Sequence, residues 1–142
     1  MKTSDEGFNL IKKYEGLRLV AYKCPVGVWT IGYGHTRGVS QGMEITQAQA
    51  DQYLRADIVS SERAVDQYNP IYNFSQGQYD ALVSFTFNCG AGNLKKLLNG
   101  GLRTKLEVSD AITRYTKAGG KTLNGLVRRR NEEKQLFDRG LL

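Results

Sequence analysis

Glu15 is the residue of this sequence best placed to do acid chemistry. It ends a predicted helix, Arg18 follows shortly after it, and the glycine-spaced run at 30–35 comes next along the chain. A carboxyl group at the edge of a helix, facing a hairpin that can hold a water molecule, can protonate the leaving oxygen of a sugar. This arrangement predicts the cleavage of a sugar polymer.

The helix that must position Glu15 is predicted to cover residues 4–15. Thr3 and the acid three residues later have the spacing of a capping box. Phe8, Ile11 and Glu15 then fall on one face, so an apolar stripe ends in a carboxyl group. An ionised carboxylate is costly to bury unless it is paired. We therefore expect Glu15 to hold a proton near neutral pH, or to pair with an arginine of the run at 128–130.

The β-rich part of the chain is predicted at residues 17–39, where aromatic and β-branched residues alternate with polar ones between glycines. This pattern favours two or three short antiparallel strands. Gly32 and Gly34 leave one face of a strand bare, which indicates the close approach of a ligand or of another backbone segment.

Helical periodicity returns after the strands. Residues 46–68 are predicted to form one long amphipathic helix with Thr46 as its N-cap. A helix that is apolar nearly all round begins near Ser75, and Gly90 and Gly92 are expected to close it.

The remaining chain is predicted to be helical as well. Short helices are expected to break at 99–101 and 118–120, where glycines are adjacent. A charged helix is expected over 124–137.

The expected fold is therefore α+β, with one two-lobed domain over residues 1–142. A small antiparallel β lobe covers about 16–45, and a connecting helix covers about 46–68. Residues 1–15 and 69–142 form a larger helical lobe. Two lobes joined by a helix predict an active-site cleft between them.

The bulk composition limits the possible functions. The net charge is +6, from 20 basic and 14 acidic residues, which favours a polyanionic partner such as an anionic cell wall. Nucleic-acid binding is not expected, because no zinc-finger or RNA-recognition signature occurs. No apolar run approaches the roughly 20 residues that cross a bilayer, so stable membrane insertion is not expected. The polar start of the sequence predicts no signal peptide.

Cys24 and Cys89 are the two cysteines, and their spacing matches no zinc or redox motif. We expect no metal, no cofactor and two free thiols, although a bridge between them stays open from sequence alone. Cys24 has three interpretations: a thiolate that acts in catalysis, a thiol that only packs, or half of a regulatory disulfide. A catalytic thiolate needs stabilisation, for which Lys23 or Lys2 is a candidate neighbour.

Five motifs occur in an order that resembles the phage-type lysozymes of glycoside hydrolase family 24, the family of the T-even phages. Together they extend over nearly the whole chain. They are EGLRL at 15–19, TIGYGHT at 30–36, FTFNCGAG at 85–92, AGGK at 118–121 and GLVRRR at 125–130.

The resemblance implies a muramidase, also called lysozyme or endolysin. Such enzymes hydrolyse the β-1,4 bond between N-acetylmuramic acid and N-acetylglucosamine in peptidoglycan, with inversion. Their site is a Glu, an Asp and a Thr, which fall at Glu15, Cys24 and Thr30. The Asp position holds a cysteine here, a variant that part of the family shares. Threonine at position 30 also suits a strand by its propensity alone.

The resemblance also implies further roles. His35 and Asp57 are expected to form a structural ion pair between the lobes rather than to act in catalysis. Tyr22, Tyr33, Phe87 and Asn88 are expected to line the sugar cleft, where aromatic faces stack on pyranose rings and an amide recognises acetamido groups. For Phe87, core packing is an equally good explanation.

The expected partners are the glycan strands of peptidoglycan, bound by a monomer. The protein is expected to be made in the cytoplasm of a bacterial host and to act on the cell wall. Two alternatives stay open. One is a lytic transglycosylase of the same fold, which needs a single acid, and the other is a non-catalytic module that binds cell walls.

Overall fold

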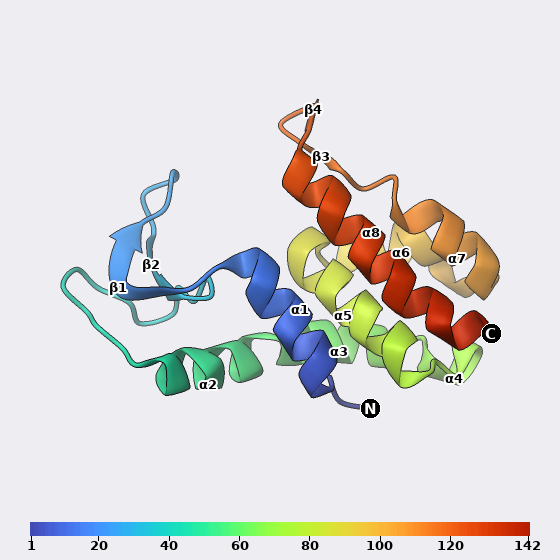
Figure 1. The fold of residues 1–142 in the computed structure, drawn as a ribbon, viewed down its shortest axis with the longest axis horizontal. Coiled ribbons are helices and arrows are strands. Elements are labelled where there is room, and N and C mark those ends of the chain that lie inside the picture. The colour runs from blue at the N-terminus through green and yellow to red at the C-terminus, as the bar shows by residue number, and fades with distance from the viewer. The chain divides into compact units, whose positions relative to one another are not determined.

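The structure is a computed structural model that describes residues 1–142. The chain folds into two compact units. Residues 11–59 form one of them, named the sheet unit, and residues 1–10 with 60–142 form the other, named the helical unit. Figure 1 labels the helices and strands of both. No helix combines the length and the apolar character needed to cross a membrane.

The sheet unit is built on an antiparallel hairpin. β1 (Arg18–Lys23) pairs with β2 (Trp29–Gly32), and Tyr22 lies opposite Thr30 in the register. The predicted short antiparallel strands are therefore confirmed. The turn between the two strands begins at Cys24.

A third segment, residues 43–45, pairs with the other side of β1. Ala21 donates its N–H to this segment, and the carbonyl of Leu19 accepts an N–H from it, both at 2.9 Å. The segment follows the stretch in which the sequence predicts strands. Its pairing protects the edge of β1 from other chains.

The core of the sheet unit is made by residues from β2, the third segment and α2 (Gln47–Asp57). Ile31, Ile45, Ala50 and Leu54 are all buried. Because one face of β2 packs against α2, the strand that carries Thr30 is held rigidly.

Helix α2 does not continue to residue 68 as the sequence predicts. It ends at Asp57 with Ile58 as its C-cap, and a separate helix, α3 (Val59–Asp66), begins directly after the cap. The prediction of one helix over 46–68 is therefore wrong. Ile58 is 1% exposed, so the apolar periodicity runs through the break and hides it from a sequence pattern.

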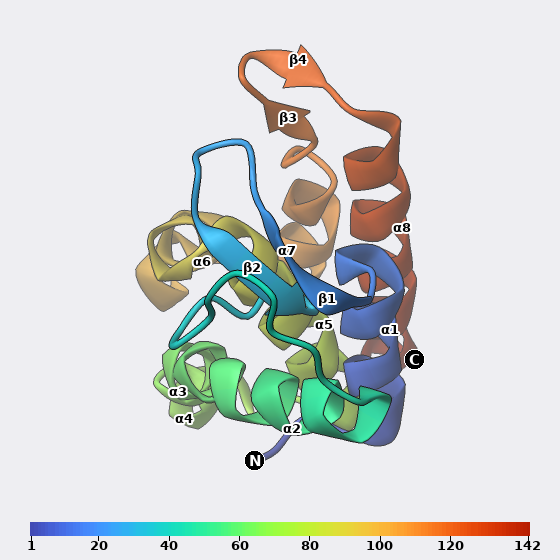
Figure 2. The ribbon, with the colours of Figure 1, turned by 90° about the vertical axis from the view of Figure 1, so that its left-hand side faces the viewer.

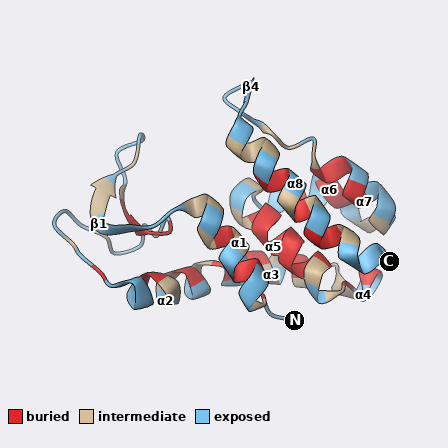
Figure 3. Ribbon diagram, viewed as in Figure 1, coloured by how far each residue is buried: buried red, intermediate tan, exposed pale blue.

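The helical unit contains most of the remaining elements. Its apolar centre is α5, which packs against α8 and α6, and most of α5 is buried in Figure 3. The elements after α3 are α4 (Asn69–Tyr72), α5 (Gln76–Cys89), α6 (Ala91–Leu98), η1 (Asn99–Gly101), α7 (Lys105–Ile112), β3 (Lys117–Ala118), β4 (Lys121–Thr122), α8 (Asn124–Asp138) and η2 (Arg139–Leu141).

Capping boxes fix the starts of α2, α5 and α7. The cap residues are Thr46, Ser75 and Thr104, and each accepts a backbone N–H three residues later. The sequence predicts the starts at Thr46 and near Ser75, and both are confirmed.

The start of α1 (Asp5–Glu15) differs from its prediction, because Thr3 makes no capping box. The N–H and the hydroxyl of Thr3 both donate to Glu62 at 2.8 Å. The N–H of Ser4 donates to Asp80 at 3.0 Å. The local cap of α1 is Ser4 instead, since its hydroxyl accepts the N–H of Gly7 at 3.4 Å.

Two glycine positions also differ from expectation. Gly90 ends α5 with φ +88, as predicted, but Gly92 lies inside α6. At 118–120 the chain forms a β3–β4 hairpin instead of a break between helices, and Figure 2 shows this hairpin leading into α8. Gly119 and Gly120 both have positive φ, of 58° and 79°, which a tight two-residue hairpin turn requires.

Candidate active site

Glu15 is the last residue of α1 and is half-buried. The turn after β2 passes beside its carboxyl group, since a Cβ placed on Gly34 would lie 4.0 Å from Glu15 Oε1. Gly34 has a φ of +93°, a conformation that favours glycine. The glycine therefore makes the turn and puts no side chain of its own beside the carboxyl group.

Cys24 occupies the first position of the β1–β2 turn, and its own N–H donates to the Val28 carbonyl at 2.9 Å. The backbone N–H groups of Val28 and Val26 lower the pKa of the Cys24 thiol below its ordinary value. The side chain of Thr30 adds a smaller lowering of this pKa. Hydrogen bonds to the charged form stabilise it, so the turn favours a thiolate.

Lys23 does not supply the positive charge that the sequence suggests for Cys24. Its ammonium group lies over the ring of Trp29, 5.4 Å from the ring centroid. Backbone N–H groups stabilise the thiolate in its place, and no sequence pattern of charged residues indicates them.

Thr30 lies in β2, is buried, and donates its single hydroxyl hydrogen to the Val28 carbonyl at 3.0 Å while the neighbouring thiol is neutral. A hydroxyl that donates to a carbonyl keeps its lone pairs to accept a hydrogen bond from water. The hairpin therefore places a thiol and an acceptor hydroxyl together. Such a pair can orient a water molecule and leave its oxygen lone pair free for attack.

His35 Nδ1 lies 2.8 Å from Asp57 Oδ2, so the contact predicted from sequence is present. The imidazole also stacks on Tyr53, with ring centroids 4.2 Å apart. Both partners belong to the sheet unit, so the pair does not join two lobes as expected but fixes the turn after β2 to α2 within that unit. This arrangement suits a structural role.

The two tyrosines predicted to contact sugar differ in exposure. Tyr22 is half-buried, and the guanidinium of Arg18 lies 4.3 Å from its ring centroid. Tyr33 is 5% exposed and has the Lys12 ammonium over its ring. Tyr22 therefore presents the larger surface for a ligand.

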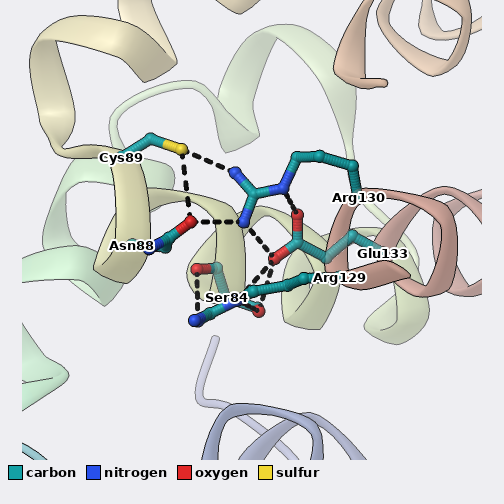
Figure 4. A network of polar contacts seen from close by, with 6 residues as sticks. All are labelled: Ser84, Asn88, Cys89, Arg129, Arg130 and Glu133. Carbon is teal, nitrogen blue, oxygen red and sulfur yellow. Dashed lines mark hydrogen bonds and ion pairs between the residues drawn. The ribbon is translucent and has the colours of Figure 1, made fainter. Parts of the chain in front are cut away.

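Phe87 and Asn88 lie at the C-terminal end of α5, in the helical unit. Phe87 is half-buried, and Asn88 is exposed. Arg130 Nη2 donates to Asn88 Oδ1 at 2.7 Å, and Figure 4 shows this contact within a larger polar network.

The network joins α5 to α8 through two arginines and one carboxylate. Arg129 and Arg130 are 3% and 0% exposed, and Glu133 is 0% exposed. Arg130 Nε lies 2.8 Å from Glu133 Oε1, and Arg129 Nε lies 3.3 Å from Glu133 Oε2. Ser84 donates its hydroxyl to the same carboxylate at 2.6 Å.

Burial raises the pKa of Glu133, and the two guanidiniums oppose this rise. Every partner of the carboxyl group is a donor, so the geometry fits an ionised carboxylate that only accepts. None of the sequence motifs points to Ser84 or Glu133 as members of a network. The signal was available, because Arg130 and Arg129 stand three and four residues before Glu133 on a predicted helix.

Both cysteines are free thiols. No group of three or more His, Cys, Asp and Glu side chains has the geometry to hold a metal ion.

The chain matches proteins of known class. Residues 12–133 match the family described as phage lysozyme. The chain is 41% identical to the endolysin of Acyrthosiphon pisum secondary endosymbiont phage 1, over 97% of this chain and 99% of that protein. It is 44% identical to the endolysin of Bacillus phage PZA, over 99% of this chain but 56% of that protein. The active form of the P1 phage endolysin Lyz superposes with a TM-score of 0.86 at 28% identity, covering 100% of this chain and 88% of that one.

The family match, the endolysin relatives and the shared fold identify a glycoside hydrolase of the lysozyme type. The chain belongs to the phage lysozyme family. The fold and the family predicted from sequence are confirmed. The roles of the individual site residues stay predictions.

Proposed function

We propose that this protein hydrolyses the β-1,4 bond between N-acetylmuramic acid and N-acetylglucosamine in peptidoglycan. The observation that carries the proposal is the position of Glu15. Its carboxyl group lies beside the bare turn at Gly34, in the same unit as the hairpin that holds Cys24 and Thr30. An acid and a water-orienting pair are the two parts that an inverting glycosidase needs.

In the proposed mechanism, Glu15 donates its proton to the glycosidic oxygen as the bond to the sugar breaks. Thr30 accepts a hydrogen bond from the attacking water. The Cys24 thiolate takes a proton from that water or stabilises the positive charge that develops on the sugar ring. Attack by water on the face opposite the leaving group inverts the configuration.

Tyr22 is proposed to contact the substrate beside the hairpin, and Phe87 and Asn88 stay predicted sugar contacts. Tyr33 presents little surface and is proposed to support the site from behind. The protein is proposed to act as a monomer on the cell wall, after synthesis in the cytoplasm of a bacterial host. Its net charge of +6 favours the approach to an anionic wall.

Digestion of purified peptidoglycan in water labelled with ¹⁸O tests the reaction class. Hydrolysis is expected to release fragments whose new reducing ends carry one labelled oxygen. Unlabelled products that end in an anhydro sugar would instead identify a lytic transglycosylase. A failure to release any fragment, although the protein sediments with the wall, would identify a binding module.

Substitutions at Cys24 test its proposed role. Cys24→Ser is expected to lower kcat by about 100-fold, since loss of a positioned base or acid typically costs at least this much. Cys24→Asp is expected to retain much of the activity, because a carboxylate supplies the same charge. A fully active Cys24→Ala variant would show that the thiol only packs.

The pH profile gives a second test of Cys24. The lowered pKa of this thiol means that the thiolate forms below the ordinary thiol pKa of about 8.5. Activity that needs the thiolate is lost as the pH falls through the pKa that the Cys24 thiol has in the folded protein. Cys24→Asp is expected to move this acidic limb to lower pH, because the free carboxyl has a pKa of about 3.9. Thiol-blocking reagents should be tested on Cys89→Ser, which leaves Cys24 as the single target.

A further inference from the structure

Lys12 lies three residues before Glu15 on α1 and joins this end of the helix to α2. Its Nζ lies 3.2 Å from Asp51 Oδ1 and 3.4 Å from Asp51 Oδ2. The two side chains are 19% and 36% exposed, so salt screens the pair less than it screens a fully exposed one. The Lys12 carbonyl also accepts the N–H of Gly16 at 3.1 Å. Lys12 therefore anchors the last turn of α1, the turn that carries Glu15.

The same ammonium group contacts the turn that borders the acid. It lies over the ring of Tyr33, 5.5 Å from the ring centroid, and Tyr33 is 5% exposed. A cation at this distance from an aromatic face is attracted to the ring. Tyr33 precedes Gly34, on which an added Cβ would lie 4.0 Å from Glu15 Oε1. One side chain thus contacts both α2 and the turn, while its own helix carries the acid.

Helix α2 is a fixed base for these contacts. Ala50, the neighbour of Asp51, is buried, and a Cβ placed on Gly32 would lie 3.4 Å from the Cβ of Ala50. This close approach holds the end of β2 against α2, and a closely packed contact transmits a displacement instead of absorbing it. The end of β2 and the end of α1 are therefore held by the same turn of α2. All of these residues belong to the sheet unit.

We propose that Lys12 is a positioning residue for Glu15. Through its contacts with Asp51 and Tyr33, it sets the distance between the carboxyl group of Glu15 and the β1–β2 hairpin. An inverting displacement needs the acid and the attacking water on opposite faces of one sugar, so a shift between them slows the bond-breaking step. The proposal rests on the proposed function and adds a residue that acts through the acid without touching the substrate.

Lys12→Met tests the proposal, because methionine keeps the apolar stem of the side chain and removes the ammonium group. The kcat for soluble peptidoglycan fragments is expected to fall about tenfold, less than the ~100-fold that a displacement of about 1 Å can cost. KM is expected to stay unchanged, because no contact with the substrate is removed. Lys12→Arg keeps a cation for Asp51 and is expected to retain most of the kcat. Lys13→Met makes the same change at the exposed neighbouring residue and is expected to match the unmodified protein.

Asp51→Asn separates positioning from a direct effect of charge on Glu15. It removes a negative charge where Lys12→Met removes a positive one, so direct effects on the acid would have opposite signs. Positioning requires that both variants lower kcat, at a temperature where thermal melts show each of them to be folded. The double variant should then be no slower than the slower single variant, because the two losses share one cause. Opposite effects, or losses that add, contradict the proposal.

The backbone N–H resonance of Gly34 reports the same geometry without any cleavage. It is expected to move in the ¹⁵N NMR spectra of Lys12→Met and Asp51→Asn, and to keep its position in the spectrum of Lys13→Met. If the unmodified protein releases no fragment from peptidoglycan, the hydrolase proposal fails, and this measurement still tests whether Lys12 positions the turn. An unmoved Gly34 resonance, or an unchanged kcat of Lys12→Met, would overturn the positioning role.

Discussion

Glu15→Gln is expected to lower the rate of peptidoglycan hydrolysis by about 10³- to 10⁴-fold. The glutamine keeps the shape of the side chain but has no proton to give to the leaving oxygen, and general acid catalysis contributes a factor of up to this size. The thermal midpoint is expected to stay the same or to rise, because a carboxyl group at the end of an apolar stripe gives up stability for function. The clearing of a suspension of bacterial cell walls measures the rate of hydrolysis. A thermal melt of the same preparation measures the midpoint.

Glu44→Gln is the matched control for this change. Glu44 is exposed and lies in the segment of the sheet unit that pairs with β1, so its loss of charge should leave clearing unaltered. Two results would remove Glu15 from the mechanism. One is that Glu15→Gln clears cell walls at the normal rate. The other is that its loss of activity is no larger than the fraction of the variant that is unfolded.

Local sequence signals account for the parts of the site that were predictable. Glu15 stands at the end of a periodic stripe, and the glycine run that follows it has few uses other than a tight turn beside another group. The capping boxes at Thr46 and Ser75 are equally local, since both partners lie within four residues. Such signals can be found in a sequence because the residues that interact are close together in the chain.

Contacts between distant residues account for what the sequence could not show. The cap of α1 lies at Ser4 rather than at Thr3, and the backbone N–H groups of these two residues donate to carboxylates distant in sequence, those of Asp80 and Glu62. Ile58 ends α2 without any glycine or proline, and its burial keeps the helical periodicity intact across the break.

The candidate active site also combines features that the sequence predicts with features that only the folded backbone shows. The residue types at positions 15, 24 and 30 were found from motifs, but the source of the stabilisation at Cys24 was not. That stabilisation comes from the backbone N–H groups of Val28 and Val26, which depend on the shape of the turn rather than on side-chain identity. A search for a neighbouring lysine therefore could not find it.

Glu133→Ala is expected to destabilise the protein by about 3–5 kcal/mol. Removal of one partner leaves a buried charge uncompensated, and this usually costs more than the pair itself contributes. Here the cost is at the upper end, because a single carboxylate balances two guanidiniums, those of Arg129 and Arg130, both nearly inaccessible to water. For a chain of this length, each kcal/mol lowers the melting temperature by about 2–4 °C, so a drop of roughly 10 °C or more is expected.

Two variants on α8 separate charge from packing in this result. Gln135→Ala truncates an exposed side chain on the same helix and is expected to change stability by less than about 0.5 kcal/mol. Glu133→Gln keeps the volume of the side chain but removes the negative charge, and it should lose most of what Glu133→Ala loses. If Glu133→Gln has the same melting temperature as the unmodified protein, the carboxyl group of Glu133 is neutral in the folded protein. The positive charges of the two arginines are then compensated by other groups. Near-normal melting of Glu133→Ala would show that the α5–α8 contact rests on its apolar side chains alone.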